Sequence, residues 1–453
     1  MFERKAYQAL LNWKNTSHGT SALLIEGARR VGKSTLARTF AQNEYDSHLI
    51  IDFSVASDDL KALFEHYRTD LDTFFLYLQA YTGTTLPRRK SLIVFDEVQR
   101  FPPAREFIKQ LVADGRYDYL ETGSLISIRR NVENIVIPSE ETALRLHPLC
   151  FEEFLGAVGE APLASLARSS FESLEPLPEP LHRKAERLFR EYMLVGGMPQ
   201  AVEAYLDQHD FGAVDAVKRD ILALYRNDIS KFGGSDATRI RRVFSTLPGQ
   251  LARHEKKFKL ASLEANARSR EYADAFFWLS DASISMTCYN VDDPSIGLSA
   301  SIDERAFKCY LGDTGLLVSQ LFADSATTPH EVYRDILLGK LEINEGMFTE
   351  NAVAQQLASN GHGLFFHSKR DDGDRNNTME IDFLIAKGYD DATGRLRISP
   401  IEVKSTKRYG AKSLEKFKAK FGKRVGTRYI LHPKPLSVEG DLVRLPLYMA
   451  TFL

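Results

Sequence analysis

The stretch GARRVGKS at residues 27–34 restricts the fold of this chain more than any other feature of its sequence. It follows the pattern G-x-x-x-x-G-K-[ST], between an apolar stretch expected to be a strand (21–27) and an amphipathic stretch expected to be a helix (33–42). Backbone N–H groups at a helix N-terminus can surround phosphate groups, and glycine permits that close approach. The alternative is an ordinary glycine turn. The flanking strand and helix favour a phosphate-binding loop in a parallel α/β domain.

Two residues of this motif carry side-chain chemistry. Lys33 is expected to reach the β- and γ-phosphates of a nucleotide, and the Ser34 hydroxyl is expected to ligate Mg²⁺. The motif therefore predicts ATP and Mg²⁺ as cofactors.

An acidic pair follows the apolar strand in LIVFDEVQ, residues 92–99. Asp96 ends that strand and is expected to hold the Mg²⁺ through water, while Glu97 is placed to orient the attacking water as a base. The alternative is a pair of acids opening a helix, where they suit the helix dipole. Together with the phosphate-binding loop, the pair favours nucleotide hydrolysis.

Further polar residues lie near the predicted strand ends. Ser124, in LETGSLIS, can touch the γ-phosphate or the water, and it can also serve as the N-cap of a following helix. Four arginines are candidates for an arginine finger, and the sequence does not choose among Arg105, Arg129, Arg130 and Arg145.

The middle of the chain reads as mainly helical. A Pro-, Gly- and Ser-rich stretch at 157–181 is expected to be a loop or a short-helix insertion, and GGMP at 196–199 a tight bend between helices. Residues 236–320 show helical spacing followed by two strands, which suggests a winged helix. The basic start of this region, TRIRR at 238–242, is a candidate contact for a phosphate backbone.

The C-terminal part predicts a second α/β unit with a carboxylate–lysine site. MEIDFLIAK (379–387) and ISPIEVKST (398–406) are expected to form a hairpin, because the residues between them are typical of turns. If the loop is centred near residue 392, Asp382 faces Glu402 across the ladder, and Lys404 shares their face.

Two interpretations of these facing acids remain open. A divalent metal, Mg²⁺ or Mn²⁺, can lie between them, with Glu350 on the preceding helix as a further ligand and Lys404 stabilising charge on a phosphate. Alternatively, Lys404 itself neutralises both acids in a structural cluster. A basic amphipathic stretch, LEKFKAKFGKR at 414–424, is either a solvated helix face or a phosphate contact.

Composition sets the outer limits. A chain of 453 residues is expected to split into several domains. A formal net charge of −2 argues against a general nucleic-acid coat, and three widely spaced cysteines indicate neither a disulfide framework nor a zinc site. The charged start of the chain and the lack of an apolar run of ~18–20 residues predict a cytoplasmic protein without a membrane partner.

Several motifs in fixed order carry a family resemblance: GARRVGKST, LIVFDEVQ, ETGS, HPLCFEEFL, YMLVGGMPQAV, YRNDISKF, YLGDTGLL, TENAVAQQL, EIDFLIA and PIEVKS. The chain resembles the bacterial and archaeal AAA-type (AAA+) ATPases that carry a C-terminal domain of unknown function. The resemblance implies an N-terminal AAA+ ATPase, a winged-helix-like middle and a restriction-endonuclease-like C-terminal part of the PD-(D/E)XK type.

The resemblance also assigns residues. It implies a Walker A loop from Gly27 to Thr35, the Walker B pair Asp96 and Glu97, and a sensor at Ser124. The nucleotide contacts expected on that loop are Gly27, Arg30, Val31, Gly32, Lys33, Ser34 and Thr35. In the C-terminal part it implies Asp382, Glu402 and Lys404 as the nuclease-fold signature with Glu350 as its helical acid, although Ile381 stands where the signature has a proline.

The sequence thus predicts an α/β protein in four parts. These are a P-loop AAA+ ATPase domain (1–185), a helical lid or connector (186–235), a winged-helix-like domain (236–330) and a nuclease-like domain (331–453). The predicted function is Mg²⁺-dependent ATP hydrolysis coupled to a nucleic-acid-related task, with DNA and a second copy of the chain as candidate partners. The alternative is a nucleotide-dependent switch or scaffold whose C-terminal domain binds nucleic acid or protein without cutting.

Overall fold

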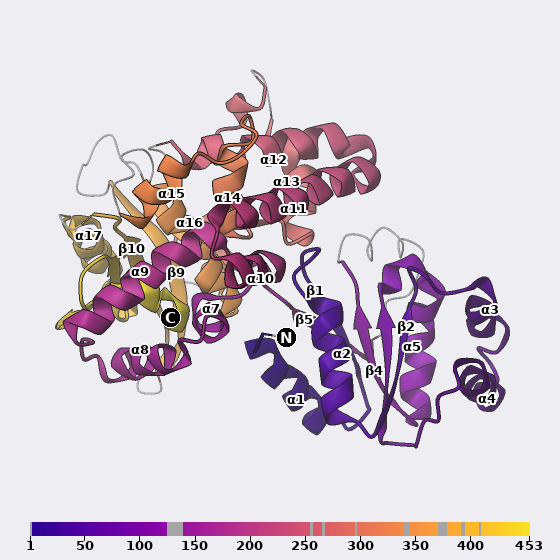
Figure 1. Cartoon of the computed structure of the whole chain (residues 1–453). Coiled ribbons are helices and arrows are strands. Elements are labelled where there is room, and N and C mark those ends of the chain that lie inside the picture. The colour runs from indigo at the N-terminus through magenta and orange to yellow at the C-terminus, as the bar shows by residue number, and fades with distance from the viewer. Residues whose placement is uncertain are drawn as a thin grey trace. The chain divides into compact units, whose positions relative to one another are not determined.

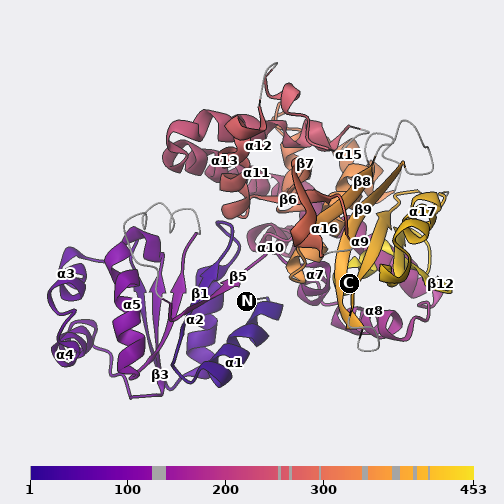
Figure 2. The same cartoon turned by 180° about the vertical axis from the view of Figure 1, so that it is seen from behind.

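The computed structural model describes residues 2–124, 139–253, 257–264, 268–294, 297–338, 345–369, 378–390, 395–406 and 409–453. The chain forms two compact units, Met1–His147 and Pro148–Leu453 (Figures 1 and 2). Each unit has its own sheet and its own candidate site.

The first unit is built on a five-stranded sheet in the order β2-β3-β4-β1-β5, and all its neighbouring strands pair in parallel. Its strands are β1 (Ala22–Glu26), β2 (Ser47–Asp52), β3 (Ser91–Asp96), β4 (Asp118–Thr122) and β5 (Glu141–Arg145). Its helices are α1 (Lys5–Ser17), α2 (Lys33–Glu44), α3 (Asp58–His66), α4 (Leu71–Thr82) and α5 (Pro102–Asp114). The predicted parallel α/β domain is confirmed, including the strand expected at 21–27 and the apolar strand that ends at Asp96.

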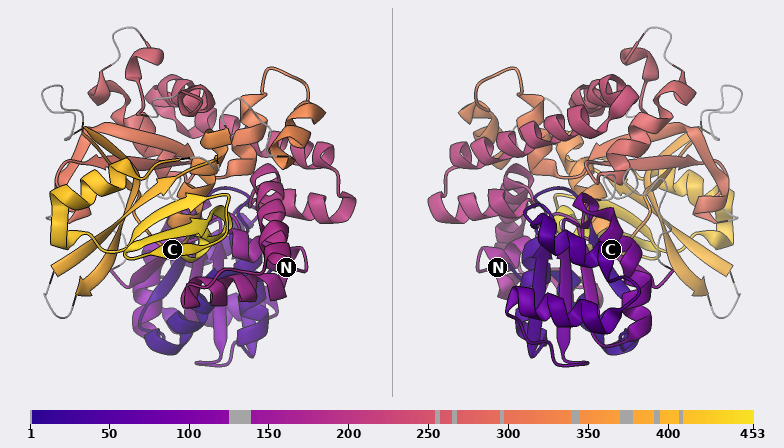
Figure 3. Two further views of the ribbon diagram at one scale, coloured as in Figure 1. Left: turned by 90° about the vertical axis from the view of Figure 1, so that its left-hand side faces the viewer. Right: turned by 90° about the vertical axis from the view of Figure 1, so that its right-hand side faces the viewer.

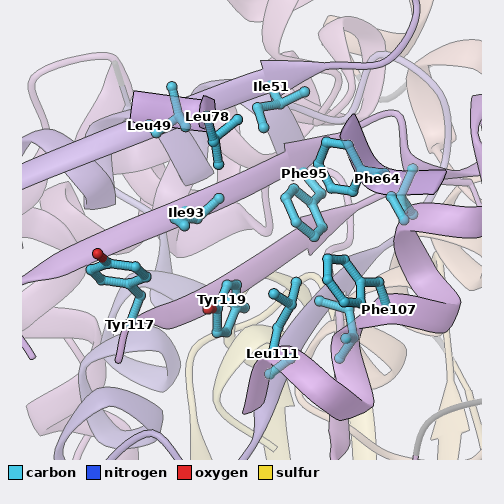
Figure 4. Packing of buried hydrophobic residues seen from close by; sticks show 14 of the residues in the cluster. Leu49, Ile51, Phe64, Leu78, Ile93, Phe95, Phe107, Leu111, Tyr117 and Tyr119 are labelled. Carbon is cyan, nitrogen blue, oxygen red and sulfur yellow. The ribbon is translucent and has the colours of Figure 1, made fainter. Parts of the chain in front are cut away.

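Aromatic side chains fill the core between this sheet and helices α3, α4 and α5. Phe64 on α3 contacts both Phe95 of β3 and Phe107 on α5, while Tyr119 lies on β4 and Tyr117 directly precedes that strand (Figure 4). Helix α2 packs close to β1, β2, β3 and β4. Since β1, β3 and β4 are buried along their whole length, the sheet is covered on both sides, as a parallel sheet requires.

The second unit begins with helices. They are α7 (Phe151–Ala157), α8 (Ala161–Ser173), α9 (Glu179–Val195), α10 (Pro199–Gln208), α11 (Phe211–Phe232), α12 (Ala237–Leu251), α13 (Ser269–Asp281), α14 (Thr314–Leu321), α15 (His330–Leu337), α16 (Glu345–Ser359) and α17 (Lys412–Phe421). The predicted helical middle is confirmed. In the stretch 157–181, where a loop or short-helix insertion was expected, α8 is a full helix with Pro162 in its first turn, a position that proline tolerates.

The second unit's sheet has eight strands in the order β12-β13-β11-β10-β9-β8-β6-β7. The strands are β6 (Ser285–Val291), β7 (Ile302–Leu311), β8 (Phe365–Lys369), β9 (Met379–Asp390), β10 (Arg395–Val403), β11 (Arg428–His432), β12 (Ser437–Glu439) and β13 (Leu442–Pro446). Figure 3 shows the orange and yellow strands of this unit from two sides. From β8 to β10 neighbouring strands are antiparallel, whereas β10 pairs with β11 in parallel.

The hairpin β6–β7, expected as part of a winged helix, is continuous with this larger sheet. Tyr289 and Asn290 of β6 pair in parallel with Phe365 and Phe366 of β8 (Figure 2). The predicted boundary between residues 330 and 331 therefore passes between strands of one sheet. The four-part division of the chain stays a prediction.

A buried polar network joins the helices of this unit to its sheet. Asp313 caps α14 by accepting from the N–H of Leu316, and it also accepts from the N–H of Gly197. A Cβ on Gly197 would lie 2.2 Å from the carbonyl oxygen of Leu149, so only glycine fits there. The GGMP break is thus a close contact between distant segments as well as a bend.

Helix α16 supplies the polar side chains of this network. Asn351 bonds to both backbone groups of Leu311, and Gln355 accepts from Thr314. Gln356 accepts from the N–H of Phe151 and donates to the Tyr192 hydroxyl. All the polar groups named are buried, so each bond avoids a desolvation cost. These side chains thereby connect α16 to β7, to α14 and to the start of α7.

Two other predictions can be compared with the structure only within its described residues. The helix expected to carry Glu350 before the hairpin is α16, and residues 339–344 between α15 and α16 lie outside the described part of the chain. Within the described residues, none of the helices is both long enough and apolar enough to span a bilayer.

Candidate functional sites

The loop between β1 and α2 has the backbone conformation that its glycines predict. Gly27 has φ +147°, Gly32 has φ +100°, and Arg30 also has a positive φ of 69°. A Cβ on Gly27 would lie 2.3 Å from the carbonyl oxygen of Leu146, which follows β5. Glycine is therefore required at position 27 for both backbone conformation and space.

Lys33 begins α2 and folds back over this loop. Its ammonium donates to the carbonyl oxygens of Gly27 and Ala28, both at 3.0 Å, and the residue is 7% exposed. Burial lowers the pKa of Lys33 to about 8, although Glu97 and Asp96 act in the opposite direction. The amine is thus a buried donor that contacts neutral carbonyl groups.

Ser34 and Asp96 come together although they are far apart in the sequence. The Ser34 hydroxyl donates to Oδ1 of Asp96 at 2.7 Å. Thr122, the last residue of β4, donates its hydroxyl to the same carboxylate oxygen. Strands β3 and β4 are neighbours in the parallel sheet, so both residues lie at its carboxyl edge. Serine and carboxylate oxygens are ligands suited to Mg²⁺, and their convergence fits an ion at this edge.

Glu97 lies directly beyond β3 with a positive φ of 53°, before the 3₁₀ helix Val98–Arg100. Its N–H donates to the Thr122 hydroxyl at 3.3 Å, and its carboxylate accepts from the Gln99 amide at 2.5 Å. A positive φ outside glycine is uncommon, and it marks Glu97 as a position that the surrounding structure holds.

The remaining candidates of this unit differ in their surroundings. Ser124 lies just beyond β4 and is half-buried. Arg105 forms a buried, two-bond ion pair with Glu141, whereas Arg145 is 42% exposed beside Glu26. Arg129 and Arg130 lie outside the described residues. Of the two described arginines, Arg145 is the more available to a ligand.

The C-terminal hairpin has the register that the sequence predicts. Ile401 pairs with Phe383 and Pro400 with Leu384, so Glu402 falls opposite Asp382. Phe383, Ile385 and Ile401 are buried, as expected for the other face of the strands.

Lys404 forms an ion pair with one of these two acids, Glu402. Its ammonium lies 2.9 Å from Oε2 of Glu402, whereas Asp382 accepts from the N–H of Val403 at 2.8 Å. Burial raises the pKa of Glu402 despite the nearby lysine. Burial lowers the pKa of Lys404, but Glu402 outweighs burial and the net direction is upward.

A second lysine enters the cluster from β7. The Lys308 ammonium lies 3.2 Å from Oε1 of Glu350, 3.5 Å from Oε1 of Glu380 and 3.7 Å from Oδ1 of Asp382. The Tyr310 hydroxyl, on the same strand, donates to Glu350. Burial lowers the pKa of Lys308, but these carboxylates outweigh burial and raise it. We call Lys308, Glu350, Asp382, Glu402 and Lys404 the carboxylate–lysine cluster.

The cluster does not have the geometry of a metal centre. Each of its acids lies within ion-pair distance of a lysine ammonium, at 3.2 Å for Glu350, 3.7 Å for Asp382 and 2.9 Å for Glu402. In the described part of the chain, no three His, Cys, Asp or Glu side chains form a group that could hold a metal ion. The residues predicted as metal ligands are therefore brought together, but around lysines.

Sequence reasoning missed one residue in each site. Thr122 lies two positions before the predicted Ser124, in the same ETGS motif, so the motif located the strand end but not the side chain that contacts Asp96. Lys308 carried no signal, because it precedes Glu350 by 42 residues and belongs to a strand expected in another domain.

Three family models match separate parts of the chain. An AAA domain matches residues 19–155, the domain of unknown function DUF8612 matches 186–327, and the domain of unknown function DUF4143 matches 345–448. None of the curated proteins compared with this sequence is a significant match. The AAA match covers the loop at 27–34, Asp96, Glu97 and Thr122. With the geometry above, it identifies the first unit as an AAA-type P-loop NTPase domain and the protein as an ATP hydrolase.

Solved structures resemble the chain more distantly. A Walker-type ATPase of Pyrococcus abyssi has 15% identity and a TM-score of 0.40, over 71% of this chain and 96% of that one. The RuvB Holliday junction branch migration motor of Thermotoga maritima has 14% identity and a TM-score of 0.26, over 65% and 90%. With such low scores, the function has to be argued from the sites themselves.

Proposed function

We propose that this protein couples Mg²⁺-dependent ATP binding and hydrolysis to a nucleic-acid-related task, through a C-terminal domain of the restriction-endonuclease type. The observation that carries the ATPase part is the convergence of Lys33, Ser34 and Asp96 at one edge of the parallel sheet. A cytoplasmic location and a homo-oligomeric state belong to the same proposal and rest on the sequence.

The residues of the first site divide the work of hydrolysis. The loop from Gly27 to Thr35 cradles the phosphates with its backbone N–H groups, and Lys33 exchanges its carbonyl partners for phosphate oxygens. Ser34 and Asp96 would hold the Mg²⁺, which would supply positive charge beside the phosphates. Glu97 accepts a proton from the attacking water, and Ser124 or Thr122 orients that water.

Topology supports the proposal for the C-terminal domain. Helix α16 precedes three antiparallel strands, β8, β9 and β10, and after α17 the chain returns as β11, parallel to β10. This is the order of elements expected for a PD-(D/E)XK core. We assign the signature positions to Asp382 and Glu402, which the strand register places opposite each other, and to Lys404 two residues on.

A specific observation favours the second candidate function, a nucleotide-dependent switch whose C-terminal domain binds nucleic acid without cutting it. Glu350, Asp382 and Glu402 all face lysine ammoniums. A nuclease of this type needs these acids for a metal, and Ile381 departs from the signature as well.

One set of assays separates the two candidates. The purified chain is incubated with labelled single- and double-stranded DNA and Mg²⁺ or Mn²⁺, with and without ATP. Binding and degradation are measured on the same samples. Degradation that Asp382→Asn abolishes supports the nuclease, whereas ATP-dependent binding without degradation supports the switch. Absence of both would remove DNA from the proposal and leave the ATPase.

A further inference from the structure

The carboxylate–lysine cluster combines residues from two stretches of chain that match different family models. Lys308 lies on β7, inside the segment matched by DUF8612, while Glu350, Asp382 and Glu402 lie inside the segment matched by DUF4143. Because β6 joins β7 to β8, one sheet carries both contributions.

Lys308 is buried and lies close to carboxylates and an aromatic ring. Its side chain is 0% exposed, and its ammonium lies 5.0 Å from the centre of the Phe366 ring. The carboxylate of Glu350 is 5% exposed and that of Asp382 is 20% exposed. Buried carboxylates without a cation repel one another and pay a large desolvation cost. The Lys308 ammonium offsets both costs, because it lies 3.2 Å from Oε1 of Glu350 and 3.7 Å from Oδ1 of Asp382.

We propose that Lys308 is the permanent cation of the C-terminal site and occupies the position that a divalent metal would need between Glu350 and Asp382. The site is thus a metal-independent lock that ties the hairpin β6–β7 to α16 and β9. The inference deepens the second candidate function, since a domain with this lock binds its partner without hydrolytic metal chemistry. It also means that a fragment starting at residue 331 lacks the cation of its own site.

The decisive experiment measures Mn²⁺ binding to the full chain without nucleotide. The Asp96→Asn substitution is present throughout, so that the proposed Mg²⁺ site of the first unit lacks its carboxylate ligand. Equilibrium dialysis and the shift of Tm with Mn²⁺ are the two measurements. With Lys308 present, we expect no saturable Mn²⁺ binding and no rise in Tm. A saturable site that Asp382→Asn removes would overturn the inference.

Removing the lysine should convert the lock into a metal site. Lys308→Met removes the ammonium that lies 3.2 Å from Glu350 and 3.7 Å from Asp382, so we expect one saturable Mn²⁺ site and a metal-dependent rise in Tm. Adding Glu350→Gln should abolish that gain. The matched control, Lys404→Met, leaves Lys308 in place and should gain no site. A folded Lys308→Met protein that binds no Mn²⁺ would also overturn the inference.

A second variant keeps the test decisive if Lys308→Met does not fold. In a chain that retains Lys308, Asp382→Asn should lower Tm equally with and without Mn²⁺, because it removes only an ion-pair partner. A loss of Mn²⁺-dependent stabilisation in this variant would contradict the inference. DNA assays play no part in these outcomes, so a failure of the proposed DNA role leaves the inference intact.

Discussion

The two units each bury one critical lysine, and the two lysines are in opposite electrostatic situations. Lys33 contacts two neutral carbonyl groups, and burial lowers its pKa to about 8. Lys308 is buried more completely, yet the carboxylates around it overcome the effect of burial and raise its pKa. Burial alone therefore does not determine the state of a lysine; its partners do.

The difference separates a site prepared for a ligand from a site that is already complete. Lys33 donates to neutral carbonyl groups of its own loop, so a phosphate group offers it a large gain. Lys308 already has Glu350 and Asp382 within ion-pair distance. An added cation must therefore displace the ammonium, and an added anion must displace a carboxylate. The site of the first unit is therefore suited to binding a ligand, whereas the cluster of the second unit is suited to stabilising the fold.

The largest expected effect is on the stability of the second unit, and it tests this comparison of the two lysines directly. Lys308→Met should destabilise the second unit by about 3–5 kcal/mol, because it removes one partner of the buried ion pair between Lys308 and Glu350. Lys33→Met should cost far less, since it removes a buried ammonium with neutral partners. Urea unfolding can be followed in each unit separately, because the chain has two tryptophans, Trp13 in the first unit and Trp278 in the second.

Replacing one tryptophan by Phe in each background assigns the transition to its unit. Equal losses for Lys308→Met and Lys33→Met would mean that both lysines are structural. Equally small losses would mean that the cluster tolerates an unpaired carboxylate, which would contradict the lock.

The next effect concerns turnover. Glu97→Gln should lower the rate of ATP hydrolysis by roughly 100-fold or more while ATP still binds, because it removes the proposed base. Lys33→Ala should instead weaken nucleotide binding. Glu65→Gln, an exposed change on α3, is the matched control and should hydrolyse at the unsubstituted rate. A Glu97→Gln protein with normal turnover would show that another residue activates the water.

The same contrast explains how far the sequence could predict the two sites. Lys33 and Ser34 are contiguous, and Asp96 ends an apolar strand that parallel pairing brings to the same edge of the sheet. Local pattern plus one rule of topology was enough. The register of Asp382 and Glu402 was equally predictable, since the turn-rich sequence between their strands indicates where the hairpin is centred.

What the sequence could not supply depends on contacts between distant segments. Lys308 reaches Glu350 only because β7 and α16 meet in one fold, and an isolated lysine in a strand has no pattern of its own. Strand β5 was missed because it is an edge strand with mostly exposed side chains and no apolar run. The close approach of Gly197 to Leu149 could not be predicted either, because it too is a contact between distant segments of the chain.

A smaller effect tests whether ion pairs hold the rest of the second unit too. Burial alone would raise the pKa of Asp215, but hydrogen bonds from Ser319, Arg219 and Thr328 outweigh it and lower the pKa to about 2. A lowered carboxyl pKa gives stability that is complete above about pH 4 and is lost as the pH falls toward 2. Asp215→Asn should therefore cost about 2 kcal/mol at pH 7, and the difference from the unsubstituted protein should shrink below pH 4.

Trp278 fluorescence during urea unfolding at several pH values measures this effect. Asp207→Asn, at an exposed position on α10, is the control and should show no such pH dependence. A constant difference between Asp215→Asn and the unsubstituted protein from pH 7 to pH 2 would mean that packing, not charge, carries the contribution of Asp215.

The smallest expected effect concerns the basic start of α12. Arg239 pairs with Asp236, Arg241 donates to Ser230, and Arg242 bonds to Glu264 and Tyr272. These intramolecular bonds favour a structural use over the binding of a phosphate backbone that the sequence suggested. Reversing all three to Glu should lower stability slightly, since exposed pairs contribute less than about 1 kcal/mol each. The salt dependence of any DNA binding should stay unchanged. An arginine that neutralises a phosphate adds about one to the slope of log K against log salt. A flatter slope in the variant would therefore show that these arginines contact DNA. The second unit would then bind DNA through α12 in addition to carrying the carboxylate–lysine cluster.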